Sequence, residues 1–231
     1  MSKKNFAISI LGLVGLMGTA WGSTCTSSSN PCTAGSASGP DTADRNIFNN
    51  DTLNTAADVT FTTINFNSVV VDPYLTGLTT DGVTFTGVDS NSAADLYVAD
   101  VTSWGNVLEQ HNGGGTITAT ISGGETYSFG IDLIDLFGTP ETFSISVNGG
   151  AAMTSAMASS DSPASVFFGY TSATPITSVT ITPLLSNDVL GIDNFELGQE
   201  APTPEMGTLV LIGSGLVFLR FIQRRRRRFL M

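Results

Sequence analysis

Positive charge is nearly absent from the middle of this 231-residue chain. Between Ser23 and Glu200 the only basic residue is Arg45, whereas 19 of the 20 acidic residues lie in that stretch. A surface without cations cannot neutralise a phosphate backbone, so the composition excludes nucleic acid as a partner. The same carboxylates are compatible with divalent cations, and with calcium in particular, because calcium prefers oxygen ligands.

Cysteine and histidine are also scarce. The two cysteines, Cys25 and Cys32, follow the first apolar segment, and the single histidine is His111. In an exported chain this cysteine pair is predicted to form a disulfide. A redox pair or a metal site is the alternative, but the spacing is not C-x-x-C. His111 is interpreted as an exposed loop residue in front of a strand.

A catalytic constellation is missing as well. Serine-type hydrolysis needs a nucleophile elbow and a histidine base, and the chain has no G-x-S-x-G motif. The best carboxylate pair for glycoside hydrolysis is Asp132 and Asp135, but an odd spacing along a strand places two side chains on opposite faces. We therefore predict that the protein is not an enzyme and carries no cofactor, with a structural calcium ion as the alternative.

Residues 1–22 are predicted to be a signal peptide. Lys3 and Lys4 precede an apolar stretch, and the small residues Ala20 and Gly22 occupy the positions that a signal peptidase inspects. We place cleavage after Gly22, with Ala20 as the alternative. Because basic residues beside apolar segments stay on the cytoplasmic side, the acidic middle is expected to cross the membrane.

Residues 23–57 and 58–198 differ in composition. The first segment is rich in Ser, Thr and Asn and is predicted to be a linker. From residue 58 onward, runs such as 116–121 and 126–133 alternate apolar and polar residues, which indicates half-buried strands. Residues 122–125, between these two runs, predict a hairpin. Many short strands without a helical period predict an all-β fold, an antiparallel β-sandwich over residues 58–198.

Exposed aromatic rings are the candidates for a sugar-binding platform. Trp104 is the one tryptophan left after signal cleavage and is the predicted ligand platform, with Tyr74, Tyr97 and Tyr170 as further candidates. Packing in the core or at a sheet edge is the alternative for each of them. Threonine-rich runs such as residues 116–120 would order water if they shared a flat face.

Asp193, near the final strand, is the predicted calcium ligand. An earlier segment, residues 89–95, begins like a calcium loop but lacks the glycine at its sharp turn. A solvated or turn-capping aspartate is the alternative for both positions.

Residues 199–231 have the layout of a membrane-targeting tail. An apolar stretch, residues 207–222, is predicted to form a transmembrane helix, and the arginine cluster 224–228 follows it. Sixteen residues reach only about 24 Å at the helical rise, so the stretch is short for a span. Arg220 would have to extend toward the basic cluster, and the segment is more typical of a removable anchor.

This tail resembles the PEP-CTERM sorting signal, a family that is also catalogued as an ice-binding protein C-terminal domain. The resemblance rests on Pro204 and Glu205, the apolar run and the arginines, and it departs from the family at Met206, where a second proline is usual. It implies recognition by an exosortase-type processing enzyme of a Gram-negative bacterium. Several short sequence segments within residues 82–195 also resemble the jelly-roll, galactose-binding-like domains that carry such a sorting signal.

Together these features predict an exported, non-enzymatic protein of the cell surface or extracellular matrix. It would be anchored in the inner membrane at least transiently, and its β-sandwich would bind polysaccharide. A structural or ice-interacting surface protein is the alternative, with the threonine faces as its support. A secreted hydrolase is the third hypothesis.

Overall fold

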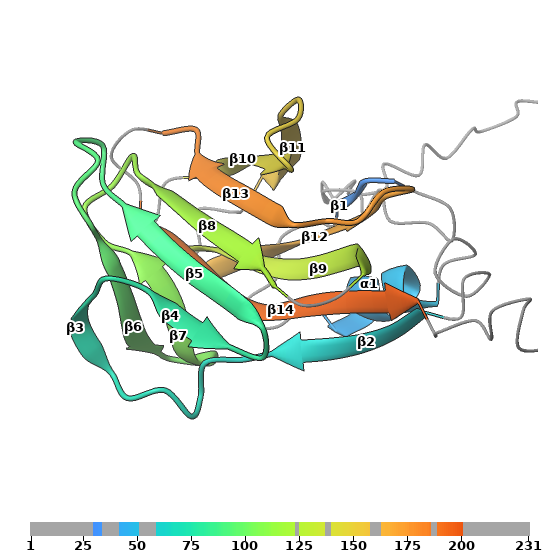
Figure 1. Cartoon of the computed structure of the whole chain (residues 1–231). Coiled ribbons are helices and arrows are strands. Elements are labelled where there is room, and N and C mark those ends of the chain that lie inside the picture. The colour runs from blue at the N-terminus through green and yellow to red at the C-terminus, as the bar shows by residue number, and fades with distance from the viewer. Residues whose placement is uncertain are drawn as a thin grey trace, which may run out of the picture.

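Two antiparallel β-sheets packed face to face make up the body of the protein (Figure 1). This computed structural model describes residues 30–33, 42–50, 59–122, 125–136, 140–157, 163–185 and 189–200. The predicted antiparallel sandwich is therefore confirmed. The predicted signal peptide and the sorting tail lie outside the described residues. Within the ranges described, no helix is both long enough and apolar enough to cross a membrane.

The larger sheet has eight strands. They are β1 (Cys32–Thr33), β2 (Val59–Ile64), β3 (Asp72–Leu75), β6 (Leu96–Val101), β7 (Gly105–Gln110), β9 (Thr126–Asp135), β12 (Ala164–Thr171) and β14 (Leu190–Glu200). Their order is β1-β12-β9-β14-β7-β6-β3, and β2 pairs with the second half of β14. The longest strands, β9 and β14, thus lie at the centre of the sheet.

The smaller sheet has six strands. They are β4 (Leu78–Thr80), β5 (Val83–Val88), β8 (Thr116–Ile121), β10 (Thr142–Val147), β11 (Met153–Met157) and β13 (Ser178–Pro183). Their order is β11-β10-β13-β8-β5-β4. Asp81 and Gly82 join β4 to β5 with φ values of 47° and 78°, as a tight hairpin with two positive φ angles requires. This turn follows directly from the Asp-Gly signal in the sequence.

The hairpin predicted at residues 122–125 is wrong. Its flanking runs are the strands β8 and β9, but β8 pairs with β5 and β13, whereas β9 pairs with β12 and β14. The connection therefore passes from one sheet to the other. Both strands alternate apolar and polar residues, and that pattern reveals a buried face without revealing which sheet contains it.

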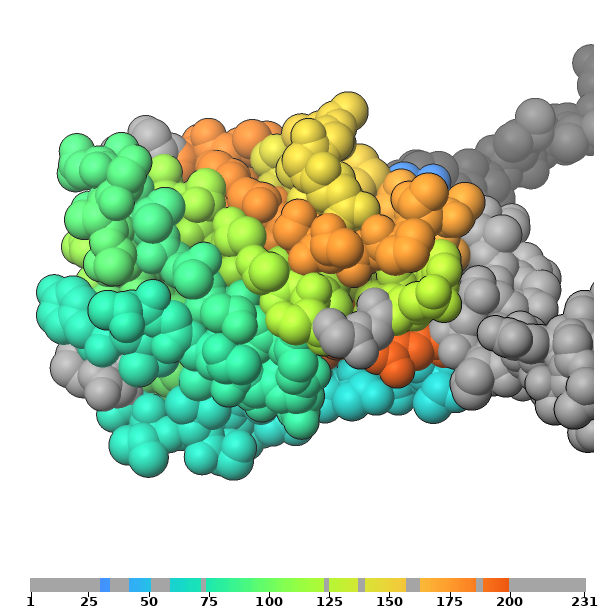
Figure 2. Space-filling model, viewed as in Figure 1, coloured from blue at the N-terminus to red at the C-terminus, as the bar shows by residue number. Residues whose placement is uncertain are grey.

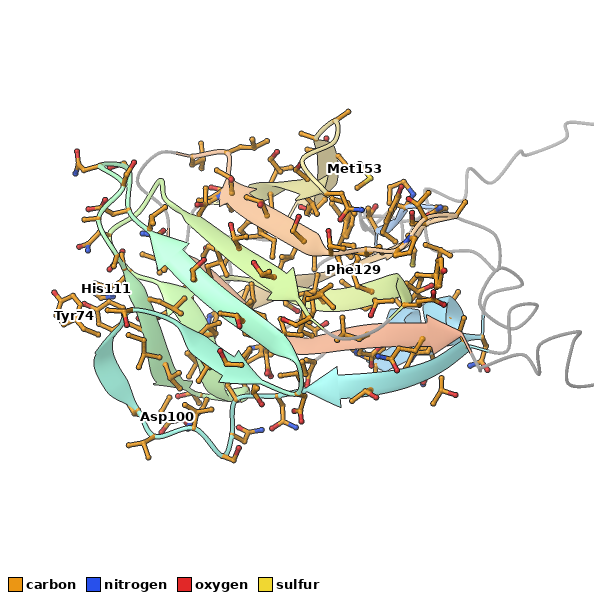
Figure 3. All side chains as sticks on the ribbon, viewed as in Figure 1. Tyr74, Asp100, His111, Phe129 and Met153 are labelled. Carbon is orange, nitrogen blue, oxygen red and sulfur yellow. The ribbon has the colours of Figure 1, made fainter. Side chains whose placement is uncertain are left out.

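The core lies between the two sheets and is rich in phenylalanine. Phe129 of β9, labelled in Figure 3, stacks on Phe195 of β14 with ring centroids 6.0 Å apart. Phe85 of β5 meets Phe195 edge-on, with ring centroids 5.5 Å apart. All three side chains are fully buried. Each such ring contributes about 1.5–3 kcal/mol by its removal from water, so these contacts hold the two sheets together.

A short helix, α1 (Thr42–Asn49), covers part of the outer face of the eight-stranded sheet (Figure 1). Phe48 packs against Phe61 and Phe167, with ring centroids 5.7 Å away in each pair. Gly169 leaves room for this ring, because a Cβ atom there would lie 2.6 Å from Phe48. The segment 23–57 thus differs from the predicted linker, since its described residues add a helix and the edge strand β1 to the sandwich.

Candidate ligand-binding site

A buried ionic cluster lies beneath helix α1, on the outer face of the eight-stranded sheet. We define it by Arg45, Asp132, Asp193, Asn194 and Glu196. The guanidinium of Arg45 lies 2.8 Å from Asp132 Oδ2 and 2.9 Å from Glu196 Oε1, and its Nη1 also donates to the backbone carbonyl of Asn194 at 2.9 Å. Asn194 Nδ2 donates to Asp132 Oδ2 at 3.0 Å. The only basic residue of the acidic body is therefore buried and paired with carboxylates inside the fold.

A bulge in β14 brings the acidic side chains of this cluster together. Asp193 and Glu196 are three residues apart, so in a regular strand they would face opposite sides. The register against β9 shifts between these two residues, and Asn194 adopts a φ of 48°. The extra residue turns both carboxylates outward, toward Arg45. The sequence pattern alone gives no sign of this convergence.

Burial controls the acidity of the cluster. Desolvation raises the pKa of Asp193 to about 7, and backbone hydrogen bonds from Asn194 and Phe66 oppose the rise only in part. Burial also raises the pKa of Asp132, against the opposing charge of Arg45. Three carboxylates share a single guanidinium, so holding the Asp193 carboxyl neutral reduces the excess of negative charge.

The calcium hypothesis for Asp193 stays a prediction. Its carboxyl is 2 % exposed and its strand partner across the sheet is Asp132. In the part of the chain that the structure describes, no group of three or more His, Cys, Asp or Glu residues is arranged to hold a metal ion. Asp89 in the earlier loop caps a turn instead, because its Oδ1 accepts hydrogen bonds from the backbone N–H groups of Asn91 and Ala93.

A second region of the same outer face carries three neighbouring aromatic rings, which we call the aromatic ladder. Tyr74 of β3 and Tyr97 of β6 have centroids 5.0 Å apart, and the imidazole of His111, just after β7, lies 4.8 Å from Tyr97. Figure 3 labels Tyr74 and His111, the two ends of the ladder, at the same edge of the sheet. A hydrogen bond with the Tyr74 side chain, the largest of several effects, raises the pKa of Tyr97 to about 12. The ladder therefore spans three consecutive strands of one sheet edge.

A groove of about 300 Å³ lies beside the ladder. Its lining includes Asp100, Val101, Thr102, Glu109, His111 and Leu136. Glu109 lies opposite Tyr97 in the register of β6 and β7, and Gly105, four residues before Glu109 on β7, lies opposite Val101. Four residues of a strand span about 13 Å, so the groove is elongated along β7. Aromatic rings next to a groove with a mixed apolar and polar lining can stack on the rings of an extended ligand.

Glu109 is the most buried charged group in this groove. It is 9 % exposed, and its Oε1 lies 3.2 Å from Nδ1 of His111. On its other side the strand neighbour is Gly191, which has no side chain. His111 is an exposed residue outside the strands, as predicted, and it is also part of the candidate site. The sequence signal that could have found this second role is its position two residues after Glu109.

Trp104, the predicted platform, occupies a different environment. Its ring is 4 % exposed and packs in an apolar cluster with Val107 and Ile134. Because Trp104 is buried, a ligand cannot stack on its ring. Tyr74, which is 67 % exposed, and Tyr97 are therefore the better candidates for a stacking platform. Tyr170 instead lies against the core residue Phe129, with centroids 6.2 Å apart.

The remaining predicted site residues lie near or beyond the ends of the described chain. Cys32 is buried and disulfide-bonded. The one other cysteine of the chain, Cys25, lies outside the described residues, so the pairing stays a prediction. Pro204 and Glu205 of the sorting motif also lie outside the described residues.

The outer face of the six-stranded sheet carries a grid of hydroxyl groups, which we call the hydroxyl face. Its members alternate with core residues along the strands and lie in register across them. Figure 2 shows the molecule from the side on which β5, β8 and β13 lie in front. They are Thr79, Thr84, Thr86, Thr116, Thr118, Thr120, Ser144, Ser146, Thr154, Ser178, Thr180 and Thr182. The hydroxyls of Thr118 and Thr180 lie 3.3 Å apart. The threonine runs of the sequence therefore share one uncharged face.

Comparisons with known proteins found matches among solved structures. No family model matches the chain, and no curated protein does. A family 29 carbohydrate-binding module from Piromyces equi is 14 % identical, with a TM-score of 0.40 over 61 % of this chain and 91 % of that one. The CBM22-1 xylan-binding domain of Paenibacillus barcinonensis Xyn10C is 8 % identical, with a TM-score of 0.38 over 61 % and 94 %. An exo-β-1,3-galactanase from Phanerochaete chrysosporium matches at 19 % identity and a TM-score of 0.34, over 60 % of this chain and 29 % of that one.

Proposed function

We propose that the protein is a non-enzymatic, exported polysaccharide-binding protein of the cell surface or extracellular matrix. The observation that carries this proposal is the aromatic ladder of Tyr74, Tyr97 and His111 beside an elongated groove. Ligand sites of this kind combine aromatic surface with a few polar groups that fix orientation.

The chemistry of the ladder suits a sugar ring. The C–H faces of a pyranose are apolar, so they are removed from water when they stack on a tyrosine. Tyr74 lies at the exposed end of the ladder, and the hydrogen bond between the two tyrosines restrains both rings before a ligand arrives. Such restraint lowers the entropy that binding would otherwise cost.

The groove carboxylates do not form a hydrolytic pair, which supports a binding role. Asp100 and Glu109 lie on adjacent strands, and the partner of Asp100 on β7 is Asn106, three residues from Glu109. The odd offset places the two side chains on opposite faces of the pleat, so they reach the groove from different directions. Glycoside hydrolysis needs two carboxyl groups that face one another across the scissile bond, about 5–9.5 Å apart.

The tail supplies the location in this proposal. The apolar stretch 207–222 would anchor the protein in the inner membrane, and an exosortase-type enzyme would act at the motif of Pro204 and Glu205 before release to the surface. Mass spectrometry of the mature protein tests this step. A mature chain that still ends at Met231 would contradict processing.

A glycan array probed with the full chain tests the binding proposal. The unmodified protein should bind at least one polysaccharide, and Tyr97→Ala should reduce that binding at least tenfold because it removes the middle ring of the ladder. Leu184→Ala is the matched control, since Leu184 is a 56 % exposed side chain that follows β13 in the other sheet. No binding to any glycan, or equal binding by the Tyr97→Ala variant, would reject the proposal.

The hydroxyl face supports a second candidate function, contact with ice or ordered water. Its twelve side chains all carry uncharged hydroxyl groups and lie in register across the strands. Neighbouring strands are about 4.8 Å apart, so the hydroxyl groups repeat at a regular spacing. Inhibition of ice recrystallisation by the full chain tests it. Thr118→Lys would place a charge at the centre of the face and should abolish any such activity, and an inactive unmodified protein would reject this candidate.

A further inference from the structure

We infer that the groove binds a polysaccharide bearing protonated amino groups, such as a deacetylated hexosamine polymer. This inference rests on the proposed function and deepens it by naming the ligand class. Two observations support it: the carboxylate of Glu109 lines the groove, and the ion pairs of Arg45 beneath α1 leave that arginine away from the groove.

The charge of the body disfavours anionic polysaccharides. Arg45 is the only basic residue between Ser23 and Glu200, and its guanidinium is 10 % exposed and paired with Asp132 and Glu196 beneath α1. No guanidinium or ammonium group of the described residues is therefore free to meet a uronate or a sulfate. A surface of one sign repels polymers of the same sign and concentrates those of the opposite sign.

Glu109 offers the specific recognition group. Its carboxylate is 9 % exposed and points from the outer face of β7 into the groove, where His111 Nδ1 at 3.2 Å is its hydrogen-bond partner. A carboxylate that is largely removed from water is stabilised by a cation at hydrogen-bond distance. Its neighbour on the β14 side is Gly191, where the side chains of Ile134 and Leu136 cover the backbone. An ammonium group on a bound sugar would place a full positive charge beside this carboxylate.

The length of the groove favours a polymer over a single sugar. Asp100 also lines the groove, but its side chain lies on the opposite face of the pleat from Glu109, so it adds negative charge without a second contact. A chain with an amino group on each ring would place one cation against Glu109 while its neighbouring rings occupy the rest of the groove. Tyr97 would meanwhile stack on a ring and attract a nearby ammonium through its π face.

Binding of three hexamers to the full chain tests the inference. They are fully deacetylated chitosan hexamer, its fully N-acetylated counterpart and a uronic acid hexamer. Binding is measured by calorimetry at a pH below the pKa of the sugar amine, so that the amine is protonated. The deacetylated hexamer should bind at least tenfold more tightly than the acetylated one, and the difference should shrink as salt rises because salt screens charge pairs.

Variants separate specific recognition from general attraction of a cation to an acidic protein. Glu109→Gln should lose most of the preference for the deacetylated hexamer while retaining its affinity for the acetylated one. Asp100→Asn should keep most of the preference, because its side chain lies on the other face of the pleat. Asp81→Asn is the matched control, because Asp81 is exposed in the β4–β5 turn and asparagine tolerates its φ of 47°. An equal loss in Asp81→Asn would overturn a recognition role for Glu109.

Two results distinguish this inference from the function on which it rests. If the acetylated, deacetylated and uronic acid hexamers bind equally, or if the uronic acid hexamer binds best, the amino-sugar inference fails and polysaccharide binding stands. If none of the hexamers binds and the glycan array is also negative, the inference and the proposed function fail together.

Discussion

Nη2 of Arg45 lies 2.8 Å from Oδ2 of Asp132, and this ion pair ties helix α1 to the central strand β9. The same guanidinium reaches Glu196 on β14, and the plane of Phe167 lies beneath it, with the ring centroid 5.0 Å from Cζ. A single side chain thus joins the N-terminal segment to three strands of the sheet. Its removal would leave two buried carboxylates without a counter-charge.

We therefore predict that Arg45→Met destabilises the protein by roughly 3–5 kcal/mol, the usual cost of breaking a buried ion pair. Chemical denaturation of the two proteins measures the difference. Ile47→Ala in the same helix is the control, because Ile47 is 39 % exposed, and it should change stability by about 1 kcal/mol or less. Equal losses in both variants would show that the cluster adds nothing specific.

Stability should fall as pH rises from about 4 to 7. The pKa of Asp193 is about 7 in the folded protein, against an ordinary value of 3.8, so the folded protein binds an extra proton in this interval. Each unit of pKa difference between the folded and unfolded states changes the free energy of unfolding by about 1.4 kcal/mol. The free energy of unfolding should therefore decrease by an amount on the order of 4 kcal/mol across this range, and the decrease should be complete above pH 7. Melting temperatures across this range measure it.

Asp193→Asn removes the titrating group and should flatten that profile. The variant should be more stable than the unmodified protein at pH 8 and close to it at pH 4. A residual slope is expected from Asp132, whose pKa is raised by burial as well. An unchanged pH profile in Asp193→Asn would show that another group controls the dependence.

Cys32→Ser should lower stability through the loss of its disulfide. If the partner is Cys25, the closed loop has eight residues, and a loop of that size gives a stabilisation of about 2.5 kcal/mol in the chain-entropy account. Non-reducing peptide mass spectrometry identifies the partner directly. Recovery of Cys25 as a free thiol would contradict this pairing.

The fold was largely predictable because strand alternation and turn residues are local signals. The Asp81–Gly82 turn, the core face of β9 and the final strand all follow from patterns a few residues long. The helix α1 was missed because eight polar-rich residues form a helix only when packed, here through Phe48 and Arg45. The crossing from β8 to β9 was missed because alternation is the same in both sheets.

The candidate site was only partly predictable. Tyr74 and Tyr97 could be named as aromatic candidates, but their meeting with His111 depends on the pairing of β3, β6 and β7, which no local pattern encodes. Trp104 was an aromatic candidate on the same grounds as the tyrosines, but its ring packs in an apolar cluster instead. The convergence of Asp193 and Glu196 depends on a bulge, which breaks the alternation rule that sequence reasoning applies.

Polysaccharide binding at the aromatic ladder is the central claim, and calorimetric titration of the best array ligand into three proteins tests it most directly. Tyr97→Ala should weaken the Kd at least tenfold relative to the unmodified chain. Tyr97→Phe keeps the ring and should stay within about threefold, since stacking rather than the hydroxyl provides most of the contact. Equal Kd values for the unmodified chain and Tyr97→Ala would contradict the claim.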